Sequence, residues 1–344
     1  MRMTTIEARP ARTVVEGQPS PASGGRYPHG CRLVGSDRAA FDRSSTSGLA
    51  PLRTQSSGSP KLDGDHHPSL LNQRRFLAMS TEVGIWIFGD HPLATSALEE
   101  TQSWVERAEQ TLSRFREDSE LSGLNRAAGR GPKKVSSLLL ASVGSALSLA
   151  HRSQGLVDPT VLSALVRAGY GPGPRCGRID YTAVHVDTEH STITLPAGIA
   201  LDLGGFAKGW LADRLASRLA KYGSVLVDMG GDLRAVGPLV WPLGVQNPWS
   251  PQEKLLDLDL EEQGVATSSI LKRNWGPGQH HLIDPRTSRP LVNDLVAATV
   301  IAPSATLAEA AAKVALLLGG QAGRRYLQKE DLRGVLFGKN GSIL

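Results

Sequence analysis

The chain has 344 residues, 40% of them hydrophobic, and a formal net charge of +5. Residues 1–75 hold 11 Lys or Arg against 6 Asp or Glu, which accounts for the whole surplus, whereas residues 76–344 hold 27 of each. Because the larger part is neutral, a basic nucleic-acid-binding face is not expected, and we predict no nucleic-acid partner. The sequence contains no run of about 18 apolar residues, so we also predict no membrane span.

The N-terminal segment differs in composition from the rest. It is rich in Ser, Pro, Gly and Arg and has no hydrophobic period. Burial cannot offset the ordering entropy of such a segment, so we predict a disordered tail over residues 1–75 and one domain over residues 76–344. The alternative is that the functional protein begins near Met79. The tail also lacks the apolar core of a secretory signal, which favours a cytoplasmic location.

Beyond the tail the hydrophobic pattern becomes periodic. Alternating β-branched and aromatic residues predict a strand over Thr81–Phe88. Apolar residues three and four apart predict a helix over Leu98–Phe115, and another is expected from Ser136 to about Arg152. Two later helices are predicted over Lys208–Lys221 and Leu307–Leu318.

Short strands are predicted around the later helices. They fall near Ala183–Val186, Thr192–Leu195, Ile199–Leu203, Val225–Asp228, Leu233–Val236, Leu243–Gln246, Leu255–Leu260, Gly264–Thr267, His280–Ile283, Val296–Ile301 and Gly334–Phe337. The strands outnumber the helices and mostly follow one another through tight turns. The fold class is therefore predicted as α+β, with mostly antiparallel sheets flanked by helices.

The segment Leu201–Asp213, LDLGGFAKGWLAD, is the most informative part of the sequence. It predicts a turn at Gly204 and Gly205, followed by a helix with Lys208 in its first turn. A turn without side chains lets phosphates approach the backbone, and a helix start offers N–H groups to an anion. Lys208 adds a positive charge, and Asp202 supplies an acceptor or a metal-ordering carboxylate beside it. This pattern predicts a site for a phosphate-bearing ligand, although a tight connection with a solvated lysine would have the same sequence.

Four other segments carry polar residues that a plain core does not need: Leu112–Asn125 (LSRFREDSELSGLN), Gly155–Leu165 (GLVDPTVLSAL), Val225–Gly237 (VLVDMGGDLRAVG) and His281–Pro290 (HLIDPRTSRP). Each has a purely structural alternative. Ser119 and Asp158 are typical of helix caps, Gly230-Gly231 is typical of a hairpin turn, and His281 beside His280 could be a surface pair.

In this order and spacing, the segments resemble the ApbE family, the FAD:protein FMN transferases. The family pattern runs through S-E-L-x-x-L-N, D-P-T-V, D-L-G-G-x-A-K-G-x-x-x-D, G-G-D, T-S-G and H-x-I-D-P-x-T-G, and the resemblance extends from about Arg75 to Phe337. It implies an ApbE-like, T-fold-like architecture. It also implies an enzyme that binds FAD and, with Mg²⁺, transfers the FMN part to a Thr or Ser hydroxyl of a target protein, releasing AMP.

The resemblance also implies roles for individual residues. Those expected to hold the flavin nucleotide are Met79, Phe115, Val157, Asp158, Asp202, Lys208 and Ile283. The carbonyl of Gly205 and the carboxylate of Glu309 are the expected metal ligands. His281 and Asp284 are the candidates for accepting the proton of the attacking hydroxyl, since a histidine has a suitable unperturbed pKa.

The sequence departs from the family pattern at the metal. The family has an Asp and, four residues later, a Thr in its last helix, where this chain has Glu309 and Lys313. A protonated lysine cannot ligate Mg²⁺ and repels it. An i,i+4 surface salt bridge is the structural alternative for this pair. Three family glycines are also serines here, at Ser80, Ser269 and Ser288, a change expected to be neutral where φ stays negative and to shift a loop otherwise.

These departures leave three functions open. The transfer can persist with Mg²⁺ held by Glu309 and Gly205, or the Lys313 ammonium can replace the metal as counter-charge. Alternatively, the chain binds FAD without transferase activity, or hydrolyses the FAD pyrophosphate with water as nucleophile.

Overall fold

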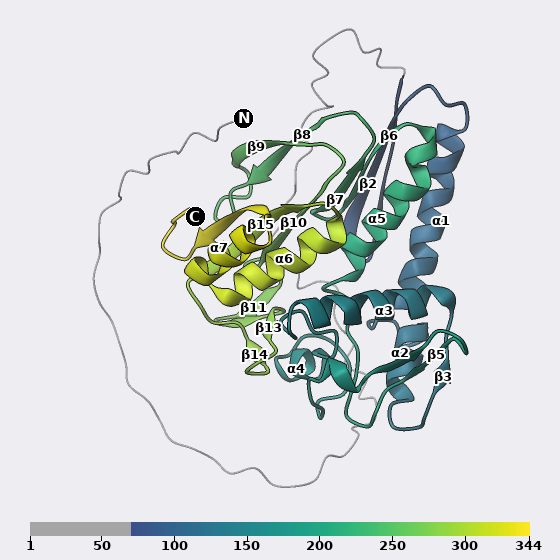
Figure 1. Cartoon of the computed structure of the whole chain (residues 1–344), viewed down its shortest axis with the longest axis vertical. Coiled ribbons are helices and arrows are strands. Elements are labelled where there is room, and N and C mark those ends of the chain that lie inside the picture. Colours follow the sequence, from purple (N-terminus) through teal and green to yellow (C-terminus); the bar gives the residue numbers. More distant parts are fainter. Residues whose placement is uncertain (1–69) are drawn as a thin grey trace. The chain divides into compact units, whose positions relative to one another are not determined.

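The computed structural model describes residues 70–344, and Figure 1 labels their helices and strands. The predicted tail lies outside the described residues up to residue 69. Its predicted boundary at residue 76 needs correction, because strand β1 (Leu71–Ala78) already includes residues 71–75. β1 pairs along its whole length with β2 (Thr81–Phe88). The sequence LNQRRFLA gives little strand signal because β1 lies at the edge of the sheet, where polar side chains are tolerated.

The main sheet has seven strands in the order β1-β2-β6-β7-β10-β15-β16, and each strand is antiparallel to its neighbours. Besides β1 and β2 it contains β6 (Ser224–Met229), β7 (Asp232–Val236), β10 (Gly264–Ser269), β15 (Leu295–Ala302) and β16 (Arg333–Gly338). The predicted α+β class with mostly antiparallel sheets is confirmed.

Helices cover one face of this sheet (Figure 1). They are α1 (Ala94–Leu112), α5 (Ala207–Leu219), α6 (Ala305–Leu318) and α7 (Gly320–Lys329). α5 packs on β6 and β7, and α6 packs on β10 and β15. The hairpin of β8 (Trp241–Gln246) and β9 (Lys254–Leu260) packs on the other face, where Trp241 and Leu260 join the buried side chains of β6 and β7.

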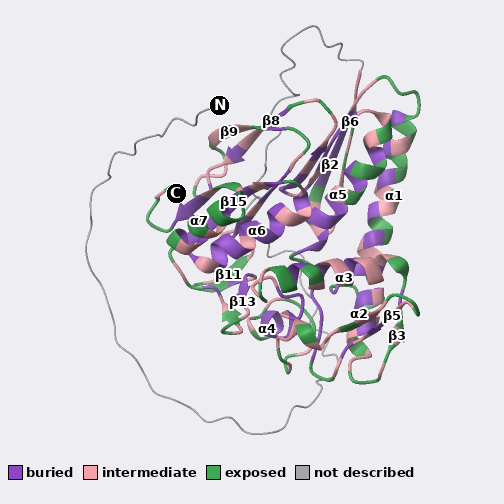
Figure 2. Ribbon diagram, viewed as in Figure 1, coloured by how far each residue is buried: buried purple, intermediate pink, exposed green. Residues whose placement is uncertain are grey.

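Successive side chains of strand β2 point to opposite faces of the main sheet. Ile85 and Ile87 belong to the core under the helices, whereas Trp86 belongs to the core under the β8–β9 hairpin. All three are at most 5% exposed, so the strand is buried on both sides. Figure 2 shows the same burial along the central strands of the sheet.

A smaller group of elements lies at the end of α1 that carries Leu112. It contains α2 (Glu120–Arg126), α3 (Ser137–Arg152), α4 (Leu162–Arg167) and a sheet in the order β3-β5-β4, formed by β3 (Lys133–Lys134), β4 (His185–Asp187) and β5 (Thr192–Thr194). Two short hairpins complete the fold, β11 (Asn274–Gly276) with β12 (Gln279–His280), and β13 (Ile283–Asp284) with β14 (Arg289–Pro290).

Most predicted elements are confirmed, with shifted ends, but three predictions were wrong. Residues Ile199–Leu203 form no strand, and the strand expected at His280–Ile283 is divided between β12 and β13. α1 ends at Leu112, so Phe115 lies beyond the helix and is 48% exposed. Helix α7 was not expected, because its sequence GQAGRRYLQK has few apolar residues.

Candidate functional site

A cavity of about 1180 Å³ lies between strand ends of the main sheet and the smaller group of elements. Its walls come from segments far apart in the chain. Predicted site residues that line it are Phe115, Val157, Asp158, Asp202, Gly205, Lys208, His281, Ile283 and Glu309, together with Lys313. The structure thus brings nine of the predicted site residues, and Lys313, to one cavity.

Two predicted site residues do not line this cavity, Met79 and Asp284. Met79 lies in the β1–β2 turn, where its side chain packs on the main core and its backbone N–H donates to Glu109 at 2.9 Å. Asp284 is buried, and both of its oxygens accept hydrogen bonds from Arg286. These contacts hold Asp284 in the turn after β13, whereas His281 lines the cavity.

The glycine bend is held by side chains from two distant segments. Asn125 pairs with the backbone of Leu201 through both its amide oxygen and its amide nitrogen, at 2.8 and 2.9 Å. Asp202 accepts from the backbone N–H of Gly204 and from the Arg114 guanidinium, each at 2.5 Å. Asp202 was expected to sit beside Lys208, but its partner is Arg114. The carboxylate therefore shapes the bend rather than facing the lysine.

Arg114 was not predicted as part of the site. Its guanidinium also donates to the backbone carbonyls of Tyr170 and Pro172, and it lies 4.1 Å from the ring centre of Phe115. Phe115 in turn contacts Tyr170 edge-on, at 5.6 Å between ring centres. The arginine holds an aromatic rim at the cavity mouth, a surface on which a flat ring system can stack.

Helices α5 and α6 approach closely beside the bend. A Cβ at Gly209 would lie 2.7 Å from the backbone oxygen of Ala305, so only glycine fits there. The N–H of Gly209 donates to Glu309 at 3.0 Å. Asp213 accepts from the N–H groups of Ala305 and Thr306 and so joins α5 to the start of α6. The glycine and the aspartate of the AKGWLAD segment therefore position the helix that carries Glu309.

Lysines and carboxylates alternate on this wall. Lys208 pairs with Asp232 and lies 4.0 Å from Glu309, while Lys313 donates to Glu309 at 2.9 Å. Burial lowers the pKa of Lys208, but the two carboxylates outweigh it and hold the pKa above its ordinary value. Burial likewise opposes ionisation of Glu309, yet the two lysines keep its pKa below the usual range. The predicted pair of Glu309 and Lys313 exists, but in the cavity wall and not on the surface.

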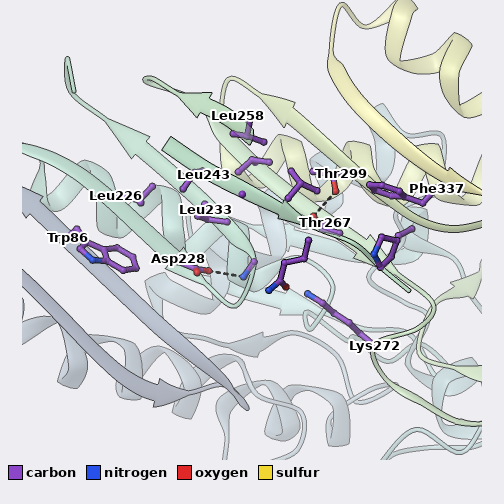
Figure 3. A pocket seen from close by; sticks show the side chains of 17 residues that line it. Trp86, Leu226, Asp228, Leu233, Leu243, Leu258, Thr267, Lys272, Thr299 and Phe337 are labelled. Carbon is purple, nitrogen blue, oxygen red and sulfur yellow. Dashed lines mark hydrogen bonds between the residues drawn. The ribbon is translucent and has the colours of Figure 1, made fainter. Parts of the chain in front are cut away.

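Two more cations were missed by the sequence analysis, Lys272 and Arg273. Figure 3 shows Lys272 extending toward the turn after Asp228, and its Nζ is 3.4 Å from where a Cβ of Gly231 would lie. Lys272 also lines a smaller apolar chamber of about 50 Å³ under the β8–β9 hairpin. Burial, followed by repulsion from Lys208, lowers its pKa. No motif in the sequence distinguishes these two residues.

The turn between β6 and β7 confirms the hairpin interpretation of Gly230 and Gly231. Their φ angles are 75° and 99°, a conformation typical of two-residue hairpin turns. Gly231 also donates to Asp228 at 2.7 Å. The same turn places Asp232 opposite Lys208, so the glycine turn is both structural and part of the cavity wall.

His281 reaches the cavity from the segment between β12 and β13. Burial, with the charges of Arg273 and Lys313, lowers its pKa to about 3, so the imidazole is neutral at physiological pH. Its Nδ1 atom is buried and has no hydrogen-bond partner among the described residues. His280 points elsewhere and interacts with the backbone of Leu291, so the two histidines do not form a surface pair.

Asp158 and Ser119 show how a cap and a site can be distinguished. Ser119 caps α2, as its structural alternative predicted, by accepting from Ser122 at 3.0 Å. Asp158 does not cap α4. It accepts from the N–H and hydroxyl of Thr160 at 2.7 and 2.6 Å, and burial raises its pKa. Asp158 therefore holds the turn before α4, a segment that lines the cavity.

The residues at the expected metal position do not fit Mg²⁺ as they stand. One oxygen of Glu309 accepts from Lys313 and the other from Gly209. A Mg²⁺ at about 2.1 Å from the first oxygen would be at most about 5 Å from the Lys313 ammonium, a repulsion of about 7 kcal/mol at an effective dielectric constant of 20. Among residues 70–344, no group of three or more His, Cys, Asp or Glu side chains could hold a metal ion.

The serines that replace family glycines differ in backbone conformation. Ser80 and Ser288 have φ angles of 57° and 55°, in the left-handed region that favours glycine. Ser269 does not adopt a positive φ, and its hydroxyl donates to Val296 and accepts from Leu271. Of the three serines, only Ser269 lacks the positive φ at which the change from glycine was expected to shift a loop.

Comparisons with known proteins identify the family. The model of the ApbE family matches residues 79–336. The FAD:protein FMN transferase of Treponema pallidum (strain Nichols) is 32% identical over 284 residues, covering 72% of this chain and 78% of that protein. The FAD:protein FMN transferase of Escherichia coli (strain K12) is 27% identical over 270 residues, covering 71% and 77%.

Solved structures show the same fold. The ApbE protein from Thermotoga maritima has a TM-score of 0.73 at 23% identity, and flavin transferase ApbE from Vibrio cholerae has a TM-score of 0.67 at 22% identity. Each match covers 80% of this chain and 96% of the other. In the described part, no helix combines the length and apolarity needed to cross a bilayer. The chain belongs to the ApbE family.

Proposed function

We propose that this chain is an FAD:protein FMN transferase. Family membership and the names of its relatives support this function over FAD binding alone or FAD hydrolysis. The observation that carries the proposal is the single cavity in which Asp158, Lys208, His281 and the glycine bend meet. A backbone bend with a lysine beside it suits a pyrophosphate, and an aromatic rim suits a flavin or adenine ring.

The reaction makes one bond and breaks one bond. The oxygen of a Thr or Ser hydroxyl on the acceptor protein attacks the phosphorus on the FMN side of the FAD pyrophosphate. The bond from this phosphorus to the bridging oxygen breaks, and AMP leaves with that oxygen. The hydroxyl proton passes to Nδ1 of His281, which is neutral and has no other partner among the described residues. The negative pyrophosphate raises the low basicity of this imidazole when FAD is bound.

The remaining residues position FAD. We assign contacts with the nucleotide to Phe115, Val157 and Ile283 on the apolar side, because all three line the cavity. Lys208 supplies positive charge to the phosphates. Asp202 acts through the backbone that it fixes, since its two oxygens already accept hydrogen bonds from Gly204 and Arg114. Asp158 fixes Thr160 through Oδ1 alone.

The products distinguish the three candidate functions. The full chain is incubated with FAD and a protein extract from its own source, and AMP, free FMN and protein-bound flavin are measured after denaturation. Transfer predicts AMP and protein-bound flavin in equal amounts. AMP with an equal amount of free FMN would instead indicate hydrolysis, and bound FAD without AMP would indicate a binding protein.

Two finer points belong to the same proposal. Peptide mapping of the flavin-labelled acceptor identifies the modified residue, and a side chain other than Thr or Ser would contradict the assigned nucleophile. The cytoplasmic location expected from the sequence stays a prediction. Fractionation of cells that express the full chain, with compartment markers, would check it.

A further inference from the structure

The side chain of Lys313 lies over the glycine bend of the cavity. Its Cε is 3.0 Å from where a Cβ of Gly205 would lie, so the lysine stem packs on the bare backbone. Its Nζ is 2.9 Å from Glu309, and the side chain is only 14% exposed. The ammonium group therefore occupies the space between the bend and the carboxylate, which is where the resemblance places a metal ion.

Charge at this end of the cavity favours an anion without any metal. The charged groups that interact around Lys208 and Asp232 are four cations, Lys208, Lys272, Arg273 and Lys313, and three carboxylates, Asp228, Asp232 and Glu309, while Asp202 at the bend is paired with Arg114. The surplus is therefore one positive charge with a neutral His281. A pyrophosphate is stabilised by fixed positive charge that needs no reorganisation during the reaction.

Lys313 is held so that it can bind two groups at once. An ammonium has three N–H donors and no acceptor. One donor is used by Glu309, which is itself fixed by the N–H of Gly209. The other donors can point to non-bridging phosphate oxygens. Removing Glu309 would free the lysine stem, so the carboxylate acts as a positioning residue.

We propose that the Lys313 ammonium takes the place of the divalent cation, so that FAD binding and FMN transfer by this chain need no Mg²⁺. This inference rests on the proposed function and deepens it. The bonds made and broken are those of the transfer step above, with the same proton acceptor. Lys313 exchanges no atom and only neutralises charge on the oxygens of the pyrophosphate.

The test compares FAD binding with and without Mg²⁺ in the full chain. Calorimetric titration of the metal-stripped protein with FAD is expected to give the same dissociation constant within about twofold in excess EDTA and in excess Mg²⁺. In Lys313→Met, which keeps the stem but loses the charge, FAD affinity should fall roughly 10- to 100-fold and not recover with Mg²⁺. In Lys313→Thr, which offers an oxygen ligand, Mg²⁺ should restore affinity.

A matched control removes the same charge elsewhere. Lys329 lies exposed at the end of α7, and Lys329→Met should leave FAD affinity unchanged. Titration with Mg²⁺ alone adds a direct measurement, with no binding expected in the wild type and binding expected in Lys313→Thr. Circular dichroism establishes whether each variant is folded, and the wild-type comparison decides the question even if the Lys313 variants are not.

The outcomes separate this inference from the proposed function. Wild-type FAD affinity or AMP release that is lost in EDTA and restored by Mg²⁺ overturns the role of Lys313 and leaves the transferase assignment intact. Absence of AMP release under both conditions overturns the transferase assignment, while the FAD affinities still test Lys313. Equal affinity of wild type and Lys313→Met would also refute the inference.

Discussion

The contact of α5 with α6 gives a sharp prediction for Gly209→Ala. The added methyl group would lie 2.7 Å from the backbone oxygen of Ala305 and 2.9 Å from a carboxylate oxygen of Glu309. Since the first of these atoms is backbone, α6 must move. Overpacking costs about 1–3 kcal/mol, and a lengthened hydrogen bond to Glu309 adds about 1.5–3 kcal/mol, against a gain in helix propensity of up to about 1 kcal/mol. We expect a net loss of about 1.5–5 kcal/mol.

Urea denaturation followed by circular dichroism measures this loss, which corresponds to a decrease in Tm of roughly 3–20 °C. Gly144→Ala is the matched control, because Gly144 lies inside α3 with no atom within 4 Å of the added methyl group. It should stabilise the protein by about 0.5–1 kcal/mol. Gly209→Ala should also weaken FAD binding, since the shift moves Glu309 and Lys313. A Gly209→Ala protein as stable as Gly144→Ala would refute the close approach of the two helices.

Three further predictions concern backbone strain, pH and a buried ion pair. Ser80→Gly and Ser288→Gly should each stabilise the protein by about 0.5–1 kcal/mol in urea denaturation, because both serines have positive φ. The neutral His281 contributes stability that is complete above the unfolded pKa of about 6.5 and is lost as pH falls toward its folded pKa of about 3, on the order of 1–3 kcal/mol by pH 4. Asp202→Ala should cost about 3–5 kcal/mol, because it leaves the Arg114 guanidinium buried without its partner.

Each of these has its own control. Ser269→Gly should destabilise, since φ is not positive there and two hydrogen bonds are lost. The pH slope assigned to His281 should be smaller in His281→Phe, and an unchanged slope would assign it to other groups. Asp202→Ala combined with Arg114→Met should recover part of the lost stability, and a purely additive loss would contradict the pairing.

Sequence patterns predicted the helices and strands whose burial follows a regular period along the chain. The side chains of Thr81–Phe88 alternate between two cores, and the predicted first and last residues of this strand are both confirmed. Ile199–Leu203 has an equally apolar sequence, but the backbone of Leu201 is satisfied by the Asn125 side chain instead of a strand. Such a pairing joins residues 76 apart in the chain, and no local periodicity reports it.

For the candidate site, individual residues could be predicted from the sequence, but their contacts could not. The glycine turn before Lys208 and the polar segment around His281 pointed to these two residues, whereas Glu309 was identified through the family resemblance. The partners of these residues were not predictable, since ion pairs such as Arg114 with Asp202 form between segments 88 residues apart. Burial could not be read from composition either, and it is burial that makes His281 neutral.

The order in which the cavity walls occur along the chain has a consequence for synthesis. The bend at Gly204 leaves the ribosome long before α6, and Gly209 and Glu309 are separated by 100 residues. A nascent chain that stops before α6 lacks both Glu309 and Lys313, and its lysine at position 208 lacks one of its two carboxylate neighbours. A chain truncated before α6 therefore lacks part of the cavity wall and is expected to bind no FAD.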